Sequence, residues 1–554
     1  MKTIFKKTKG WLVVGLLAIM TYVSFAFATS YFELSKNLDI FATLYKELNI
    51  YYVDDTEPGE LMETAIDAML ESLDPYTNYI PETAIEDYRI QTTGQYGGIG
   101  ALIRKSKNAV IISEPYEGYP ADKAGLKAGD SILKIDGKKV GGKSTDDVSS
   151  VLKGQPGTKV KLIIERPGEK STFEKVLTRE EVKIESIPYY GMVGDGIGYI
   201  RLRSFTAKCS QEVKEAFLDL KKQGELKGLV LDLRGNPGGL LHEAVSMCNI
   251  FVEKGQEVVS TKGKVKDWDK TYLTKQMATD TEIPLTVLVD QGSASASEIV
   301  SGTLQDLDRA VIIGNRTFGK GLVQQTRKLS YNSQLKVTIA KYYTPSGRCI
   351  QAINYADKDE DGGVVKLPDS LRTEFKTLHG RSVFDGGGID PDIDVEQEEF
   401  GLILVSLISK MLIFDFATDY VLQNETIAAP EDFEVSDEMF ESFVSYLDGK
   451  DYEYETRTEK QITKLKEIAA DEEYMGQMED VINGLEEEFA KHKADDLHKY
   501  KEQIKDFLRS EIVTRYYKQK GRIKAELQDD KDLATALEVL KDETRYKSIL
   551  SGKK

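Results

Sequence analysis

Three apolar segments in the middle of the chain constrain its fold most. They read KGLVLDLRG from Lys227, PLTVLVD from Pro284 and RAVIIGN from Arg309. Each is a short apolar run that ends in glycine or small polar residues, and helical patterns lie between the runs. Strands that are apolar on both faces are typical of a sheet buried between layers of helices. The pattern therefore predicts an α/β domain, which we place over residues 183–400.

The regions before and after this domain differ from it in their pattern of apolar residues. The chain has 554 residues, too many for one compact core, so several domains are expected. Residues 29–86 have apolar residues at helical spacing, and residues 87–182 have short alternating runs separated by glycine and proline, which predict a β-rich domain. Residues 401–554 are rich in Glu and Lys at helical spacing. We therefore expect a multidomain α/β protein with helical regions at both ends.

The N-terminus has the pattern of an export signal. Four lysines within the first nine residues precede an uncharged apolar run from Trp11 to Ala28. This pattern fits a secretory signal cleaved before Thr29, and the run at residues 11–28 also reaches the length of a short membrane anchor. Both interpretations predict that the rest of the chain lies outside the cytoplasm, either periplasmic or membrane-anchored.

Composition excludes several classes of function. The formal net charge is −18, and the only basic cluster is at the N-terminus, which argues against nucleic acid as the main partner. Cys209, Cys248 and Cys349 form neither a disulfide framework nor a zinc motif, so we interpret them as buried small residues with at most one pair. The acidic segment 357–362 begins like a calcium loop but has Pro368 at the twelfth position, so a charged surface loop is the better interpretation. No metal and no cofactor are expected.

Three segments combine into a pattern that indicates acyl transfer. GNPGG, from Gly235, precedes a helical pattern and offers backbone N–H groups to an anion. DQGSASASEIV, from Asp290, places serines at a predicted strand-to-helix junction, and TFGKG places Lys320 between two glycines. A nucleophile, a base and an oxyanion hole would account for all three. Spacing alone does not rank Ser293, Ser295 and Ser297.

The residue patterns alone do not identify the catalytic base that would activate the serine. The chain has four histidines, and none has an obvious acidic orienting partner in the sequence; His242, just after the glycine loop, is the one to weigh. A serine–lysine pair is the recognised alternative. A lysine acts as a base only when its amine is neutral, which burial favours.

The motifs and their order resemble those of the carboxyl-terminal processing peptidases, also called tail-specific proteases. The resemblance runs from about Leu34 to Asp392 and rests on the following segments: LDPYTNYI, GGIGA, PADKAGLKAGDSILKIDG, IGYIRLRSF, LVLDLRGNPGGLL, GSASASEI, TFGKGLVQQ, YYTPSGRCIQ and GIDPD. It implies a crotonase-like or ClpP-like αβα protease core with a PDZ domain inserted before it.

The resemblance also implies roles for particular residues. The nucleophile falls on Ser295 and the base on Lys320, with Gln324, one helical turn later, orienting the lysine. The oxyanion hole falls on the N–H group of Ala296 and on one from the glycine loop, Gly238 or Gly239.

The PDZ domain implied by the resemblance has a function of its own. Its loop offers the N–H groups of Gly98, Ile99 and Gly100 to the terminal carboxylate of a peptide, which then adds as a strand to an open sheet edge. The expected activity is therefore an exported serine endopeptidase that recognises protein C-termini and cleaves near them. The alternatives are an inactive PDZ scaffold on a protease-like fold and a crotonase-like acyl-CoA enzyme. Candidate further partners are a second copy of the chain or an adaptor.

Overall fold

The computed structural model describes residues 31–106, 109–358, 364–366 and 368–552. The predicted signal or anchor at residues 11–28 lies outside them. Two compact units, residues 1–79 and 80–554, are each described by themselves. The first contains a helix over residues 31–51 and α2 (Pro58–Glu71), in agreement with the two helical patterns. Among the described residues, no helix combines the length and apolar character needed to span a membrane.

The β-rich domain forms one antiparallel sheet. Its strands run in the order β3-β4-β5-β7-β8, so β3 is an edge strand, and the short β6 pairs with β5. Helix α5 (Thr145–Leu152) begins at a capping box in which Ser144 and Asp147 bond each other's backbone N–H groups. A ribbon of β2 (Gln95–Gly98) and β9 (Glu180–Lys183) leads into and out of this domain. The sheet strands and the remaining short helix are β3 (Ala101–Ser106), β4 (Ala109–Pro115), β5 (Ser131–Ile135), β6 (Lys138–Lys139), β7 (Lys159–Glu165), β8 (Phe173–Thr178) and α4 (Pro120–Lys123).

A six-stranded sheet forms the centre of the α/β domain. Its order is β10-β11-β12-β15-β16-β23, and all neighbours are parallel except β10 and β11. The three apolar segments of the sequence form its central strands, and every residue of these strands is buried. The strands are β10 (Tyr189–Met192), β11 (Ile197–Arg201), β12 (Gly228–Asp232), β15 (Leu285–Val289), β16 (Val311–Gly314) and β23 (Ile393–Asp394).

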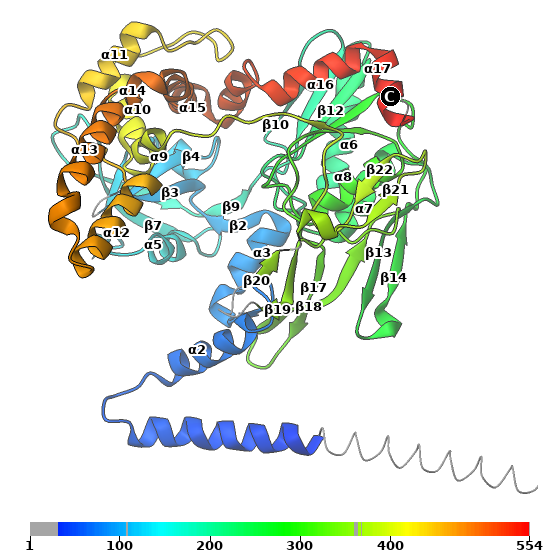
Figure 1. Ribbon diagram of the computed structural model, residues 1–554, viewed down its shortest axis with the longest axis horizontal. Helices are drawn as coiled ribbons and strands as arrows, with labels where there is room; N and C mark the ends of the chain where they lie inside the picture. The colour runs from blue at the N-terminus through cyan, green and yellow to red at the C-terminus, as the bar shows by residue number, and fades with distance from the viewer. Residues whose placement is uncertain (1–30, 107–108, 359–363, 367, 553–554) are drawn as a thin grey trace, which may run out of the picture. The chain divides into compact units, whose positions relative to one another are not determined.

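Two layers of helices cover this sheet, and they come from different parts of the sequence. Helices α6 (Cys209–Gln223), α7 (Leu241–Phe251) and α8 (Ala296–Asp306) pack on one face. Helices α16 (Lys531–Lys541) and α17 (Glu543–Leu550) pack on the other, where Leu533, Ala536, Val539 and Tyr546 contact the strands (Figure 1). The last helices of the chain therefore complete the α/β domain.

A second, antiparallel sheet lies beside the first and includes β13, β14, β17 and β18. Its long strand β18 (Gln334–Tyr343) pairs with β17 (Leu322–Lys328) and with β13 (Glu257–Gly263), and β13 pairs with β14 (Lys270–Leu273). Two small ribbons follow: β19 (Ile353–Lys358) with β20 (Val364–Lys366), and β21 (Glu374–Lys376) with β22 (Ser382–Phe384). All three cysteines are free; Cys209 and Cys248 are buried and Cys349 is partly buried.

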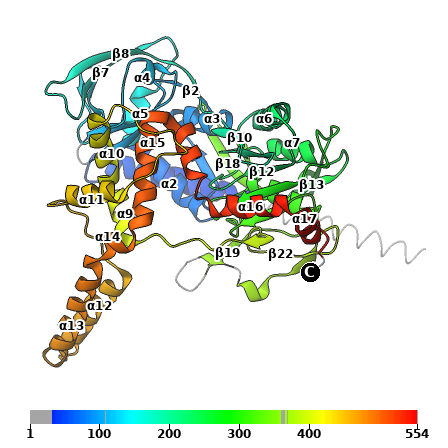
Figure 2. The same ribbon diagram turned by 90° about the horizontal axis from the view of Figure 1, so that it is seen from above.

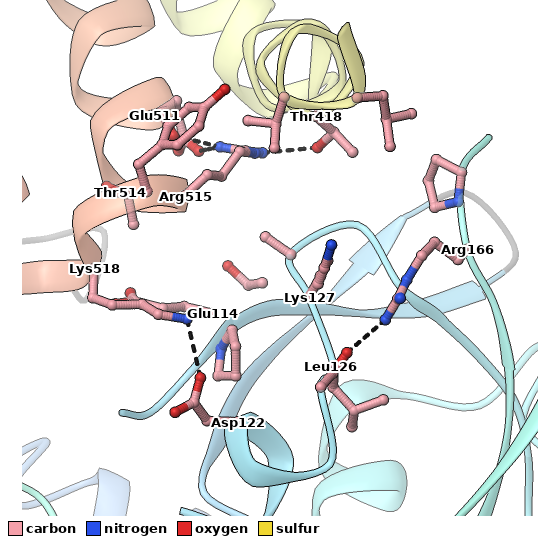
Figure 3. Close-up of a pocket in the computed structure, with 18 of the residues that line it drawn as sticks. Glu114, Asp122, Leu126, Lys127, Arg166, Thr418, Glu511, Thr514, Arg515 and Lys518 are labelled. Atoms are coloured by element: carbon pink, nitrogen blue, oxygen red, sulfur yellow. Dashed lines mark hydrogen bonds and ion pairs between the residues drawn. The ribbon is translucent and has the colours of Figure 1, made fainter. Parts of the chain in front are cut away.

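The C-terminal helices have their own apolar core and also contact the β-rich domain. Lys518 of the long helix α15 forms an ion pair with Asp122 of α4 at 3.2 Å, and the Arg104 guanidinium lies 5.2 Å from the Phe414 ring centre. Figure 3 shows the cavity of about 470 Å³ between these two parts. Helices α12 and α13 form a hairpin that extends away from the other helices (Figure 2). The helices are α9 (Leu402–Ser409), α10 (Leu412–Gln423), α11 (Asp437–Tyr446), α12 (Arg457–Asp471), α13 (Met475–Ala494), α14 (Asp496–Lys499) and α15 (Lys501–Glu526).

Candidate active site

Ser295 occupies a sharp turn between β15 and α8. It is the N-cap residue of α8, and its backbone has φ 54° and ψ −109°. A positive φ is sterically unfavourable for a residue with a side chain and persists only where the surrounding structure enforces it. Such strained strand-to-helix turns hold the nucleophilic serine in α/β-hydrolases.

The three serines of this segment have different surroundings. The Ser293 hydroxyl is buried and donates to the Leu233 carbonyl oxygen at 2.8 Å. The Ser297 hydroxyl is also buried and donates to the Asn236 carbonyl oxygen at 2.8 Å. Ser295, in contrast, lines a cavity of about 680 Å³, which we call the central cavity. Only Ser295 of the three faces a space that a substrate could enter.

A buried carboxylate, Glu298, connects Ser295 with Lys320. Its Oε2 accepts from the Ser295 N–H at 2.8 Å and from the Lys320 N–H at 2.9 Å. Its Oε1 accepts from the Thr317 hydroxyl at 2.6 Å and from the Gly319 N–H at 2.7 Å. Burial raises the pKa of the Glu298 carboxyl above its ordinary value, although these four hydrogen bonds favour the ionised form.

Tyr342, on β18, contacts Ser295 and Lys320 through their backbone carbonyl oxygens. Its hydroxyl lies 2.7 Å from the Lys320 carbonyl oxygen and 3.1 Å from that of Ser295. The side chain is buried, and burial, followed by the nearby Glu298, raises the pKa of the phenol well above its ordinary value. Tyr342 therefore stays neutral and can donate. Ser295 and Lys320, 25 positions apart in sequence, are held together by two shared partners.

The glycine loop packs directly against Ser295. A Cβ atom on Gly238 would lie 2.8 Å from the Ser295 Cβ and 2.8 Å from the Ala296 nitrogen, so only glycine fits there. The Gly238 N–H already donates to the Asn236 side chain at 2.9 Å. Within the described parts of the chain, no residue accepts a hydrogen bond from the N–H groups of Gly239 and Ala296. These two groups are therefore the available donors beside the Ser295 hydroxyl.

The central cavity brings together all the residues predicted for catalysis. Its lining includes Gly238, Gly239, Ser295, Ala296, Lys320 and Gln324. One expectation about them is wrong. Gln324 does not lie one helical turn after Lys320, because the segment LVQQTRK forms strand β17 and pairs with β18. The Gln324 side chain donates from Nε2 to the Thr338 hydroxyl at 3.2 Å.

The histidines lie elsewhere. His242 is largely exposed and lies 3.7 Å from Glu243 without lining the central cavity. His379 is near Asp308, and His492 and His498 are on the C-terminal helices. All four histidines lie in the part of the chain that the structure describes, and none of them lines the central cavity.

The predicted carboxylate-binding loop lies between β2 and β3. Gly98 is the last residue of β2 and pairs with Glu180, whereas Ile99 and Gly100 form the connection to β3. Gly100 has φ 70°, and a Cβ atom there would lie 2.4 Å from the Tyr119 Cβ. In the described structure, no residue accepts from the N–H groups of Ile99 and Gly100, and all three residues are buried.

Two residues of this site were missed in the sequence. Glu298 stands three positions after Ser295, which is the capping-box spacing, so its position could have been noticed. Tyr342 gives no local signal, because it reaches the site only through the pairing of β18 with β17.

Comparison with known protein families matches three parts of the chain. Residues 196–364 match Peptidase family S41, residues 111–166 match a PDZ domain, and residues 403–540 match the family described as Probable PDZ-protease, C-terminal helical domain. The β-rich domain is therefore a PDZ domain.

Two relatives in sequence agree with this assignment. The chain is 40% identical over 321 residues to the carboxy-terminal-processing protease of Bartonella bacilliformis, covering 57% of this chain and 73% of that protein. It is 35% identical over 356 residues to a probable CtpA-like serine protease of Staphylococcus aureus, covering 62% and 71%. Among solved structures, the photosystem II D1 C-terminal processing protease is 29% identical, with a TM-score of 0.35 and coverage of 64% and 92%. The chain belongs to the carboxy-terminal-processing proteases, serine-type peptidases of family S41 with a PDZ domain.

Proposed function

We propose that this protein cleaves proteins near their C-termini with Ser295 as nucleophile and Lys320 as general base. The observation that carries the proposal is the pair of shared partners, Glu298 and Tyr342, which hold the Ser295 turn against the Lys320 loop at one cavity. The six-stranded sheet between two helix layers supports a crotonase-like or ClpP-like core as the framework of this site.

The proposed reaction follows from this arrangement. The neutral Lys320 amine takes the Ser295 hydroxyl proton as Oγ attacks the scissile carbonyl carbon. The negative charge that develops on the carbonyl oxygen is stabilised by the N–H groups of Ala296 and Gly239. Lys320 then returns its proton to the leaving amine, and a water molecule hydrolyses the acyl-enzyme. Gln324 lines the same cavity as Lys320 and donates to Thr338, and it is proposed to orient the lysine.

We further propose that the PDZ domain selects substrates by their C-terminal carboxylate. Support comes from the N–H groups of Ile99 and Gly100, which have no acceptor within the described residues, and from the position of β3 at the sheet edge beside α5. A peptide that adds to β3 would direct its carboxylate toward these N–H groups. Gly98, the last residue of β2, lies directly before these two residues.

Ser295→Ala and Lys320→Arg are expected to lower kcat by more than about 10³-fold on a protein substrate, because one lacks the nucleophile and the other cannot be deprotonated. His242→Ala is the matched control and should keep near-normal turnover, since His242 lies outside the central cavity. Steady-state kinetics of the purified variants test this. Normal turnover in Lys320→Arg would mean that the base is another residue.

Glu298→Gln is expected to weaken the site although the side chains have the same shape. The amide NH₂ would face two donors at one end of the side chain, which removes two hydrogen bonds and costs about 2–4 kcal/mol. Chemical denaturation and kcat should both show the loss. The exposed Glu253→Gln is the control and should match the unmodified protein. If the two variants have equal stability and equal activity, Glu298 does not hold the Ser295 turn and the Lys320 loop together.

A substrate with an amidated C-terminus should be cleaved more slowly than the same substrate with a free carboxylate, because the amide loses the charge that the Ile99 and Gly100 N–H groups would bind. Competition between the two substrates in one reaction measures the ratio of their kcat/KM values directly. A ratio of one would show that the PDZ domain does not recognise the terminus.

We also propose that the protein is exported and acts in the periplasm or at the outer face of the membrane, with a second copy or an adaptor as a further partner. The lysine-rich start and the apolar run at residues 11–28 support export. In cells fractionated after expression, the enzyme is expected outside the cytoplasm, and mass spectrometry of its N-terminus should find either Thr29 or the intact run. Recovery from the cytoplasm with the intact N-terminus would refute export.

A further inference from the structure

The residue just before the oxyanion loop is held by the C-terminal end of the chain. Arg234 precedes Gly235–Gly239, and its guanidinium contacts three carboxylates. Two bonds go to Asp232, from Nε at 3.0 Å and from Nη2 at 2.7 Å. The others go to Asp530 at 2.9 and 2.5 Å and to Asp532 at 2.9 Å. The oxyanion loop therefore begins at an ion-pair network in which two of the three acidic partners, Asp530 and Asp532, lie almost 300 positions away in sequence.

The network is mostly buried. The exposed fractions of the Asp232, Arg234 and Asp532 side chains are 0%, 18% and 5%. Burial opposes the ionisation of Asp232, but the charge and hydrogen bonds of Arg234 outweigh it, so the pKa of Asp232 is below its ordinary value. Breaking a buried pair by removing one partner is costly, because the remaining charge loses its compensation. Arg234 therefore has one well-defined position when its acidic partners are in place.

The acidic partners are themselves fixed by the core. Asp530 caps α16 by accepting from the Leu533 N–H at 2.9 Å, and Asp532 also accepts from the Gln397 side chain at 3.1 Å. The helix that follows packs on β12, β15 and β16 through Leu533, Ala536 and Val539 (Figure 1). The position of the two carboxylates is therefore determined by the same sheet that carries Ser295.

The loop on the other side of Arg234 leaves little room for movement. The Gly235 N–H donates to Asp290 at 2.8 Å, and the Asn236 carbonyl oxygen accepts from the Ala294 N–H at 3.0 Å. At Gly238 even a Cβ atom would lie 2.7 Å from the Ala294 carbonyl oxygen, so the loop packs closely against the Ser295 turn. Arg234 is joined directly to Gly235, the first residue of this loop. A displacement of Arg234 would therefore shift the loop and change the spacing between the Gly239 and Ala296 N–H groups.

We propose that Asp530 and Asp532 are positioning residues of the active site, which act through Arg234 to hold the oxyanion loop against Ser295. The inference rests on the proposed function of that loop. It means that the catalytic unit is incomplete without the first residues of α16, although these follow a helical region more than 100 positions long. The two aspartates touch neither substrate nor nucleophile and contribute by geometry alone.

The test compares Asp530→Asn/Asp532→Asn with the unmodified full-length enzyme. Asparagine retains the N-cap of α16 while removing both charges from Arg234. The double variant is expected to have kcat lowered about tenfold with KM nearly unchanged, since a misplaced oxyanion donor affects the transition state more than the bound substrate. Asp529→Asn is the matched control, because Asp529 is exposed and pairs with Arg509 instead. It should retain full activity.

A pair of inhibitors distinguishes a specific displacement of the oxyanion donors from a general loss of order in the active site. A peptide aldehyde forms a hemiacetal oxyanion on the serine, whereas the peptide alcohol of the same sequence does not. The aldehyde should bind the double variant about tenfold more weakly and the alcohol equally well. An unchanged kcat, or the same loss of affinity for both inhibitors, would overturn the inference.

If the double variant does not fold, the two single variants provide the test. Asp530→Asn and Asp532→Asn should each lower the melting temperature but stay folded at the assay temperature, and each should weaken aldehyde binding by a smaller factor than the double variant. Absence of any selective effect in both folded single variants would equally overturn the inference. If the aspartate variants show no selective effect while Ser295→Ala is inactive, only the positioning role of the aspartates is refuted. If Ser295→Ala is active, the proposed function itself is refuted.

Discussion

The site depends on the buried carboxylate of Glu298. Four donors converge on its two oxygens, and two of them are the main-chain N–H groups of Ser295 and Lys320. A buried acid with all its lone pairs engaged is rigid, since every small shift breaks a hydrogen bond in a low-dielectric environment. This rigidity maintains the unfavourable backbone of Ser295 and fixes the distance between the two loops of the proposed catalytic pair.

The α/β domain gains its second helix layer from the far end of the chain. Helices α16 and α17 cover the face of the sheet opposite α6, α7 and α8, and the residues that begin α16 bind Arg234 next to the oxyanion loop. The C-terminal region also reaches the PDZ domain, where Lys518 pairs with Asp122 at a break in α15 (Figure 3). The helical region thus contacts both the domain proposed to bind substrate C-termini and the domain that carries the catalytic residues.

Much of this architecture could be predicted from local sequence. The apolar runs fix the buried strands because both faces of each strand must be apolar, and the serine segment predicts its own turn because small residues precede a helical pattern. The strand at Gln324 could not be recognised from an apolar run, since five of the seven residues of LVQQTRK are polar and its pairing with β18 is not encoded within the segment itself. Glu298 was missed because its spacing also fits an ordinary helix cap. The contacts of Asp530 and Asp532 with Arg234 span almost 300 positions, and no local pattern encodes them.

The most direct test of the central claim is covalent labelling with a fluorophosphonate, followed by tandem mass spectrometry of the digested protein. The account predicts a single adduct on Ser295 and a much slower labelling rate in Lys320→Ala, because the lysine must take the serine proton during attack. An adduct on another serine, or labelling of Ser295 at an unchanged rate without Lys320, would contradict it.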